Sequence, residues 1–139
     1  MNSTRWLNRV MDSAYHNPAA TFYIGLSSVL EKEEDGSITY LEPTSDLTGY
    51  KRVELGELSN AENGIIVNLN DIVFPESTAS WWDGQVQAAY WVLFDGEGEG
   101  ATALSGGSLD TPHYIERNTI ITIPAGLLTI TILDYDAIA

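Results

Sequence analysis

The stretch from Asn118 to Leu133, NTIITIPAGLLTITIL, carries the clearest fold signal in the chain. Isoleucine and threonine alternate on both sides of Pro124-Ala125-Gly126, and a period of two is the pattern of a β-strand with one buried face. The sequence Pro-Ala-Gly between such runs is typical of a turn. We therefore predict a β-hairpin here, with strands over Thr119–Ile123 and Leu127–Leu133.

The same kind of pattern extends from Thr21 to the end of the chain, because β-branched and aromatic residues gather in short runs separated by Gly, Pro, Asn and Asp. Turn signals occur at Glu34-Asp35-Gly36, at Asn63-Gly64 and over Asp95–Gly100. We predict a mainly β protein, a single antiparallel β-sandwich with jelly-roll-like topology. Its other strands are predicted at Thr21–Ser27, Ser37–Leu41, Tyr50–Leu55, Ile65–Leu69, Gln85–Phe94 and Ala101–Ser105.

The first residues follow a different period, since apolar residues recur at steps of three and four behind the possible caps Ser3 and Thr4. This pattern predicts a short α-helix over Thr4–Tyr15, which ends at Asn17-Pro18 because the residue before proline disfavours helical angles. Residues 1–17 then form an N-terminal helix, either part of the domain or a docking arm, and residues 18–139 form the sandwich. A chain of 139 residues is about one domain long.

Charge and composition exclude several functions. The 20 acidic residues outnumber the 6 Lys and Arg residues, which gives a net charge of -14 at pH 7. Such a surface repels nucleic acid and anionic lipid, so we expect neither as a partner. No apolar run approaches the roughly 18 residues that span a bilayer, and we expect no membrane insertion. The chain has no cysteine, which excludes disulfides and thiolate chemistry.

Aromatic and basic residues are the candidate contact sites. Arg5 and Arg9, with Trp6, lie on the predicted helix, and basic charge at one end of an acidic chain could attract an acidic partner. The apolar face of this helix packs either on the domain's own sheet or on another protein. Trp81, Trp82 and Trp91 could form a surface that stacks on sugars. For Trp82 and Trp91 we favour a place in the core or in a subunit interface.

Other polar motifs give weak chemical signals. Asp95, Glu97 and Glu99 alternate with glycine like the first half of a calcium loop, but the second half is missing, so a solvated acidic hairpin tip is favoured over an ion site. Ser108, Asp110 and His113 lie close together in sequence, yet no nucleophile elbow surrounds the serine. We therefore predict no catalytic residues, no cofactor and no metal, and thus no enzyme.

Several short blocks appear in a fixed order along the chain. They are Leu26-Ser27, Glu42-Pro43, Gly49-Tyr50-Lys51-Arg52-Val53, Phe74-Pro75-Glu76-Ser77-Thr78 with Trp82, Val86, Leu93-Phe94-Asp95, Leu104, Gly107, Leu109, Pro112 and Ile123–Ile130. This succession resembles a family of small tail-fibre-like or head-surface structural proteins of tailed bacteriophages. The sequence departs from that pattern at Trp81-Trp82-Asp83-Gly84, which replaces a single tryptophan and glycine, and at the bulky Trp91.

The resemblance implies a non-enzymatic structural protein of a bacteriophage virion. Its expected place is either the capsid surface, as a decoration protein or head fibre, or the tail apparatus. The implied partners are other capsid or tail proteins, and the implied assembly is a homo-oligomer, preferably a trimer. The alternative is a receptor- or carbohydrate-binding module of a phage appendage, which would use the paired tryptophans.

Overall fold

The structure is a computed structural model, and it describes residues 22–43, 47–56, 58–59, 65–82 and 86–131. The helix predicted within residues 1–17 and the turn predicted at Asn63-Gly64 lie outside the described residues. Within them every strand pairing is antiparallel, so the prediction of a mainly β, antiparallel protein is confirmed.

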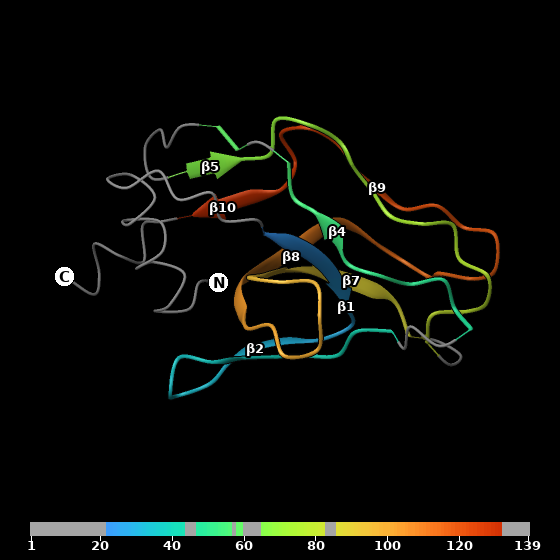
Figure 1. Cartoon of the computed structure of the whole chain (residues 1–139), viewed down its shortest axis with the longest axis horizontal. Helices are drawn as coiled ribbons and strands as arrows, with labels where there is room; N and C mark the ends of the chain where they lie inside the picture. The colour runs from blue at the N-terminus through green and yellow to red at the C-terminus, as the bar shows by residue number, and fades with distance from the viewer. Residues whose placement is uncertain (1–21, 44–46, 57, 60–64, 83–85, 132–139) are drawn as a thin grey trace.

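The centre of the molecule is a four-stranded sheet with the order β4-β1-β7-β8 (Figure 1). Its strands are β1 (Tyr23–Ser27), β4 (Val53–Glu54), β7 (Ala88–Phe94) and β8 (Ala103–His113). The β7 sequence AAYWVLF has no polar face, which is typical of a strand that is buried on both sides. The structure agrees, because Trp91, Val92, Leu93 and Phe94 are all at most 3% exposed.

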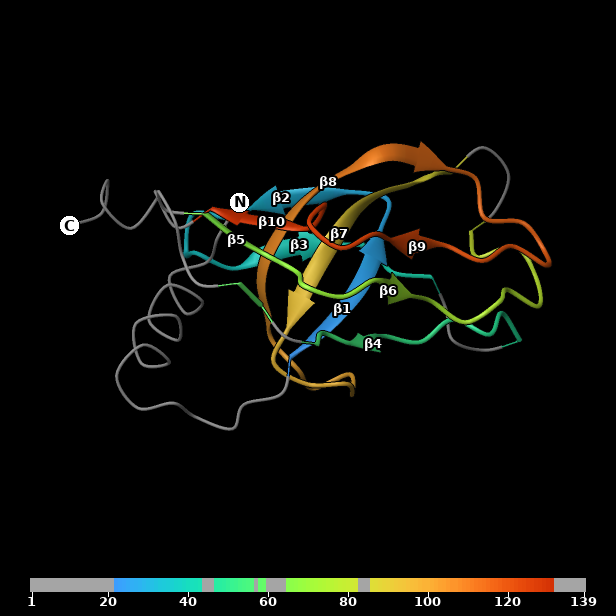
Figure 2. The same cartoon turned by 90° about the horizontal axis from the view of Figure 1, so that it is seen from above.

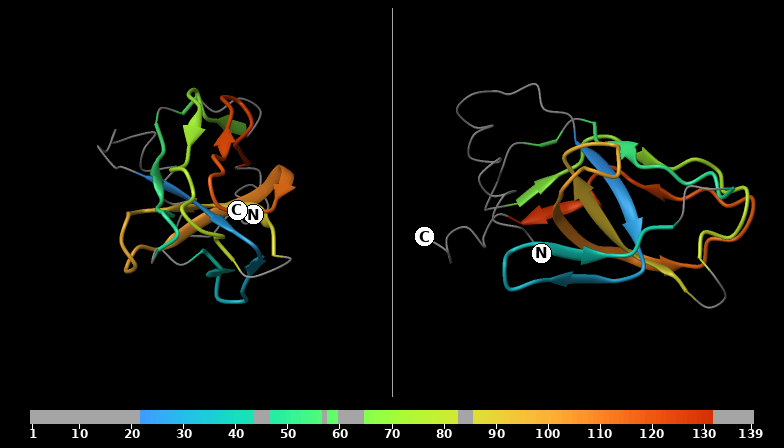
Figure 3. Two further views of the ribbon diagram at one scale, coloured as in Figure 1. Left: turned by 90° about the vertical axis from the view of Figure 1, so that its right-hand side faces the viewer. Right: turned by 60° about the horizontal axis from the view of Figure 1, so that its bottom comes forward.

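Two different parts of the chain cover the two faces of this sheet. On one face Val92 and Phe94 pack with Ile38 in a small cluster under the hairpin of β2 (Leu30–Lys32) and β3 (Ile38–Tyr40). The ring of Tyr40 meets that of Phe94 edge-on, with centroids 5.1 Å apart. The hairpin turns at Glu34-Asp35-Gly36, as the sequence predicted, and Gly36 takes a positive φ of 89° there. Figure 3 shows this hairpin at the bottom of its right-hand view.

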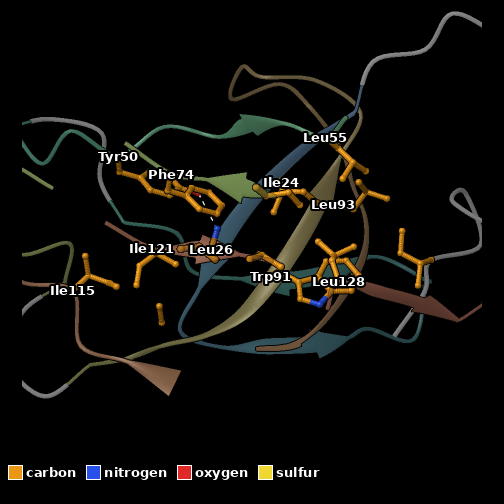
Figure 4. Close-up of a cluster of buried hydrophobic side chains, with 14 of the residues drawn as sticks. Ile24, Leu26, Tyr50, Leu55, Phe74, Trp91, Leu93, Ile115, Ile121 and Leu128 are labelled. Atoms are coloured by element: carbon orange, nitrogen blue, oxygen red, sulfur yellow. Dashed lines mark hydrogen bonds between the residues drawn. The ribbon is translucent and has the colours of Figure 1, made fainter. Parts of the chain in front are cut away.

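The opposite face carries the main core. Alternate residues of the central strands, among them Ile24 and Leu26 of β1 and Trp91 and Leu93 of β7, meet side chains of two further strand pairs (Figure 4). These pairs are β5 (Ile65–Val67) with β10 (Thr129–Thr131) and β6 (Ile72–Val73) with β9 (Thr122–Ile123). Figure 2 shows the two pairs end to end across the central sheet.

The hairpin predicted from Asn118 to Leu133 is wrong in its pairing. The turn exists, since the amide of Leu127 donates to the carbonyl of Pro124 and Gly126 has a φ of 86°. However, β9 pairs with β6 and β10 pairs with β5, so the two runs do not pair with each other. Alternation sets which face of a strand is buried but not which strand lies beside it, and here the segment with β9 and β10 runs antiparallel to the segment with β5 and β6.

Asn68 holds the joint between these two strand pairs. The registers of the β5–β10 and β6–β9 pairs differ by one residue, so one extra residue is accommodated between them. The side chain of Asn68 is 2% exposed. Its Oδ1 accepts hydrogen bonds from the amides of Gly126 and Leu128, and its Nδ2 donates to the carbonyls of Asn70 and Pro124. This one amide thus satisfies backbone groups that the broken ladder leaves unpaired.

The predicted strands locate most of the observed ones but not their lengths. The strand predicted over Tyr50–Leu55 shortens to β4, and the one predicted over Ala101–Ser105 is the start of β8, which continues to His113. The sequence analysis missed β2 and β6, which are only three and two residues long. Runs this short contain too few alternations to produce a periodic signal.

Candidate functional site

The three candidate tryptophans of the body of the chain occupy different environments. Trp81 and Trp91 are 2% and 3% exposed and belong to the main core, which is the environment favoured for Trp91. The indole N–H of Trp81 donates to the carbonyl of Thr48 over 3.1 Å. A stacking platform needs an open ring face, and neither of these two rings presents one. Trp82 is half-buried against the core, and its buried indole nitrogen has no hydrogen-bond partner among the described residues.

The remaining predicted contact residues, Arg5, Trp6 and Arg9, lie outside the described residues.

The blocks Glu42-Pro43 and Gly49–Val53 come together in a buried charged cluster. The guanidinium of Arg52 makes a bidentate contact with the carboxylate of Glu42, with Nη2 2.7 Å from Oε1 and Nε 3.0 Å from Oε2. The two side chains are only 8% and 14% exposed. The guanidinium also lies 3.5 Å above the centroid of the Phe94 ring. Paired charge, two parallel hydrogen bonds and an aromatic face together compensate for the removal of this cation from water.

Tyr50 completes the cluster from the same block. Its hydroxyl donates a short hydrogen bond to Oε2 of Glu42 and accepts one from the amide of Leu26 in β1 (Figure 4). Burial, the negative charge of Glu42 and this hydrogen bond raise the pKa of Tyr50 far above its ordinary value. Burial alone would lower the pKa of Arg52, but the hydrogen bonds and charge of Glu42 outweigh it, so that pKa is raised. Both groups therefore keep their protons at any physiological pH.

A glycine in β1 makes room for this cluster. A Cβ atom on Gly25 would lie 2.6 Å from the Tyr50 hydroxyl, 2.7 Å from Oε2 of Glu42 and 2.9 Å from the Phe94 ring. Contacts this short are not tolerated by ordinary side chains. The position is therefore restricted to glycine by close packing, although its backbone conformation does not require one.

Arg52 also organises the acidic loop Asp95–Gly100 that joins β7 to β8. Its Nη1 lies within 3.5 Å of the carbonyl oxygens of Gly96, Glu97 and Gly98, and the contact with Gly98 is 2.8 Å. Asp95 acts inside the loop, where its Oδ1 accepts the amide of Thr102 over 2.7 Å. Glu97 and Glu99 are exposed. Among the described residues, no three acidic or histidine side chains converge as metal ligands.

The Phe74–Thr78 block is a second structural clamp. Ser77 is fully buried, and its hydroxyl donates a short hydrogen bond to the carbonyl of Glu116 and accepts the amide of Thr119. The backbone of Ser77 exchanges further bonds with Asn118 and Thr119, so the chain before β9 is fixed against the chain after β6. Asn118 has a positive φ of 65°, which an asparagine tolerates better than most residues.

Ser108, Asp110 and His113 do come close together, but not as a catalytic triad. All three line a pocket between β8 and the segment that contains β9, and no hydrogen bond joins them in the described part of the chain. The sequence could not indicate this pocket, because the predicted strand ended at Ser105 and the pocket depends on an irregular continuation of β8. The described residues contain no helix that is long and apolar enough to cross a membrane.

Comparison with known proteins shows the family of the chain. No curated protein matches the chain. The family model described as Podophage GP4 fiber I protein gp80 matches residues 1–131, which is nearly the whole chain. The match includes the Glu42-Pro43, Gly49–Val53 and Phe74–Thr78 blocks, whose side chains hold the fold together in this structure. The chain therefore belongs to the Podophage GP4 fiber I protein gp80 family, a phage fibre-like structural protein family, and is a component of the virion.

Proposed function

We propose that this protein is a non-enzymatic fibre component of the phage particle, fixed either on the capsid surface, as a decoration protein or head fibre, or on the tail. The observation that carries the proposal is the family match over residues 1–131. A fibre component has to hold exposed loops in fixed positions while it contacts other virion proteins. The clamp at Ser77 and the cluster at Arg52 are suited to this task, because each fixes a surface loop with buried hydrogen bonds.

The buried environment of Tyr50 supports a role without catalysis. The pKa of Tyr50 is strongly raised, and its hydroxyl is engaged with Glu42 and the backbone of Leu26. A catalytic group of this kind would have to face a cavity that a substrate can enter. Tyr50 is instead 5% exposed in the main core.

The layered arrangement of the described residues supports the proposal of a sandwich over residues 18–139, and the helix within residues 1–17 stays a prediction. The main core lies between the central sheet and the two pairs β5–β10 and β6–β9, as in a two-layer β-protein. The jelly-roll form of the sandwich has less support, because the second layer consists of two-stranded pairs in the described part of the chain.

A homo-oligomer, preferably a trimer, is the assembly that we propose for this component. Several large apolar side chains remain exposed on the described surface, including Leu47 at 83%, Ile120 at 56% and Leu41 at 53%. Leu47 also has a positive φ of 62°, a conformation that is unfavourable for leucine. A strained residue that points an apolar side chain into solvent is well suited to an interface.

Immunogold electron microscopy of intact particles tests the location. An antibody against the folded protein is applied to purified phage, and we expect label at regular positions on either the head or the tail. Label on the head supports a decoration protein or head fibre, and label on the tail supports a tail fibre. Particles that lack the protein, in a preparation where a capsid protein is labelled as a positive control, would overturn the proposal.

A further inference from the structure

The pocket beside β8 has the features of a built binding site. Its volume is about 260 Å³, and it lies between the second half of β8 and the segment from Ile121 to Leu127. Because β8 is the edge strand of the central sheet and β9 pairs with β6, the two walls belong to different sheets. Pockets for drug-sized ligands have volumes of about 300–1,000 Å³, so this one suits a ligand of a single ring.

An irregularity in β8 forms the polar wall. Between the pairs Tyr90–Ser108 and Ala88–His113, β7 advances by two residues whereas β8 advances by five. The extra residues of β8 have no partners in β7, and they place Asp110 and Thr111 in the pocket wall with Ser108 and His113. Bulges of this kind are over-represented beside binding and active sites, where they re-aim side chains.

The opposite wall of the pocket is mainly apolar. Ile121, Ile123, Pro124 and Leu127 form it together with the polar Thr122, and Leu127 is 54% exposed. The indole of Trp91 reaches the base across Gly107, since a Cβ atom on Gly107 would lie 2.8 Å from its Cζ2 and Nε1 atoms. Gly107 is thus the position in β8 that allows an indole from β7 to reach this pocket.

We propose that this pocket binds one neutral, hydroxyl-rich ring, such as a sugar at the end of a glycan chain. A sugar ring has an apolar C–H face and a hydroxyl edge, and the pocket has one mainly apolar and one mainly polar wall. The carboxylate of Asp110 accepts hydrogen bonds from hydroxyl groups, and the hydroxyls of Ser108 and Thr111 can donate or accept them. The net charge of -14, with a carboxylate in the wall itself, disfavours an anionic ligand.

This site goes beyond the proposed structural role and is independent of it, because incorporation into a particle does not require an occupied pocket. It also differs from a platform built on paired tryptophans, since only the edge of one buried indole takes part.

Titration followed by NMR tests the proposal on the full-length chain. The probes are the methyl glycosides of glucose, galactose, mannose and N-acetylglucosamine, with glucuronic acid as the anionic comparison. We expect at least one neutral glycoside to shift the amides of Ser108–His113 and Ile121–Leu127 in a saturable manner. Glucuronic acid should bind at least tenfold more weakly.

Two variants, each of which replaces one carboxylate by the amide of the same shape, test whether Asp110 contributes to sugar binding. Asp110→Asn removes the carboxylate from the pocket, and Glu99→Gln makes the equivalent change on the exposed loop. We expect Asp110→Asn to weaken binding about tenfold or more and Glu99→Gln to leave it unchanged, with both variants retaining the wild-type amide spectrum elsewhere. Absence of any saturable shift up to tens of millimolar, equal binding by both variants, or shifts confined to another surface would each overturn the proposal. The immunogold experiment tests the structural role separately, so failure of the binding proposal would leave the structural proposal intact.

Discussion

Arg52 is a buried cation that contacts three distant parts of the chain. It contacts Glu42, the Phe94 ring and the carbonyls of the loop Asp95–Gly100, which are more than 40 residues away in sequence. The sequence analysis recognised the loop as an acidic turn and considered an ion for it. It could not identify Arg52 as the group in contact with that loop, because no local pattern indicates which distant side chain a loop will meet.

Removal of this cation should destabilise the fold strongly. Arg52→Met would leave the carboxylate of Glu42 buried without a partner, and we expect a loss of about 3–5 kcal/mol in the free energy of unfolding. Urea denaturation measures the loss. Lys51→Met removes the same charge from an exposed neighbour and should change stability by less than about 0.5 kcal/mol. Equal effects of the two substitutions would show that the buried pair is not important for stability.

Tyr50 makes stability depend on pH in the alkaline range. Its pKa is raised from 10.0 in the folded state, so above about pH 10 only the unfolded chain releases this proton. The stabilisation is complete below pH 10 and is lost as pH rises, by up to about 1.4 kcal/mol per pH unit. Urea denaturation between pH 8 and 11 should show this slope in the wild type and a shallower one in Tyr50→Phe. Identical slopes would contradict the assignment.

At the scale of the elements, the face that each strand buries was easier to predict than its partner. The alternation in Asn118–Leu133 correctly indicates strands, and Ile121, Ile123, Leu128 and Ile130 are all buried. The pairing of β9 with β6 and of β10 with β5 could not be predicted. Strand β6 is only two residues long, and the side-chain amide of Asn68 bonds the backbone between the two strand pairs. Asparagine in sequence is typical of a turn, so nothing local marks Asn68 as the residue that links two sheets.

Asn68 should contribute more to the stability of the fold than the exposed Asn70 does. In Asn68→Asp the Nδ2 donor becomes an oxygen that faces the carbonyls of Asn70 and Pro124, and we expect a loss of about 3 kcal/mol or more in the free energy of unfolding. Asn70→Asp makes the same chemical change at an exposed position and should cost little. Hydrogen exchange provides a local readout, because repulsion between the new oxygen and the carbonyls of Asn70 and Pro124 should open this region and expose the amides of Gly126 and Leu128 only in the first variant. Equal protection of these amides in both variants would contradict the conclusion that Asn68 links the two strand pairs.

At the scale of the whole molecule, composition and the order of the sequence blocks were informative about class and family, and much less so about sites. The antiparallel β class and the phage fibre-like family follow from patterns that extend along the entire chain. The tryptophans were harder to place, because an aromatic residue in a strand has the same sequence signature in a core as on a contact surface. The pocket depends on a long-range register shift in β8 that no sequence pattern indicates.

The proposed oligomer leads to a prediction about Leu47. Leu47→Gly removes an apolar side chain that is 83% exposed and places glycine at a φ of 62°, where it is unstrained. We expect the variant to keep its thermal stability as a folded chain but to associate more weakly. Light scattering over a range of concentrations measures both proteins. A wild-type chain that stays monomeric at every concentration would contradict the homo-oligomer.

The position of Arg52 under the loop Asp95–Gly100 has a consequence for the life of a particle outside the cell. An ion taken up from the medium dissociates when the medium is diluted or a chelator is added, whereas a cation tethered to the chain keeps a constant local concentration. The carbonyls of Gly96, Glu97 and Gly98 contact such a tethered cation. The loop therefore has a cation that neither dilution of the medium nor a chelator can remove.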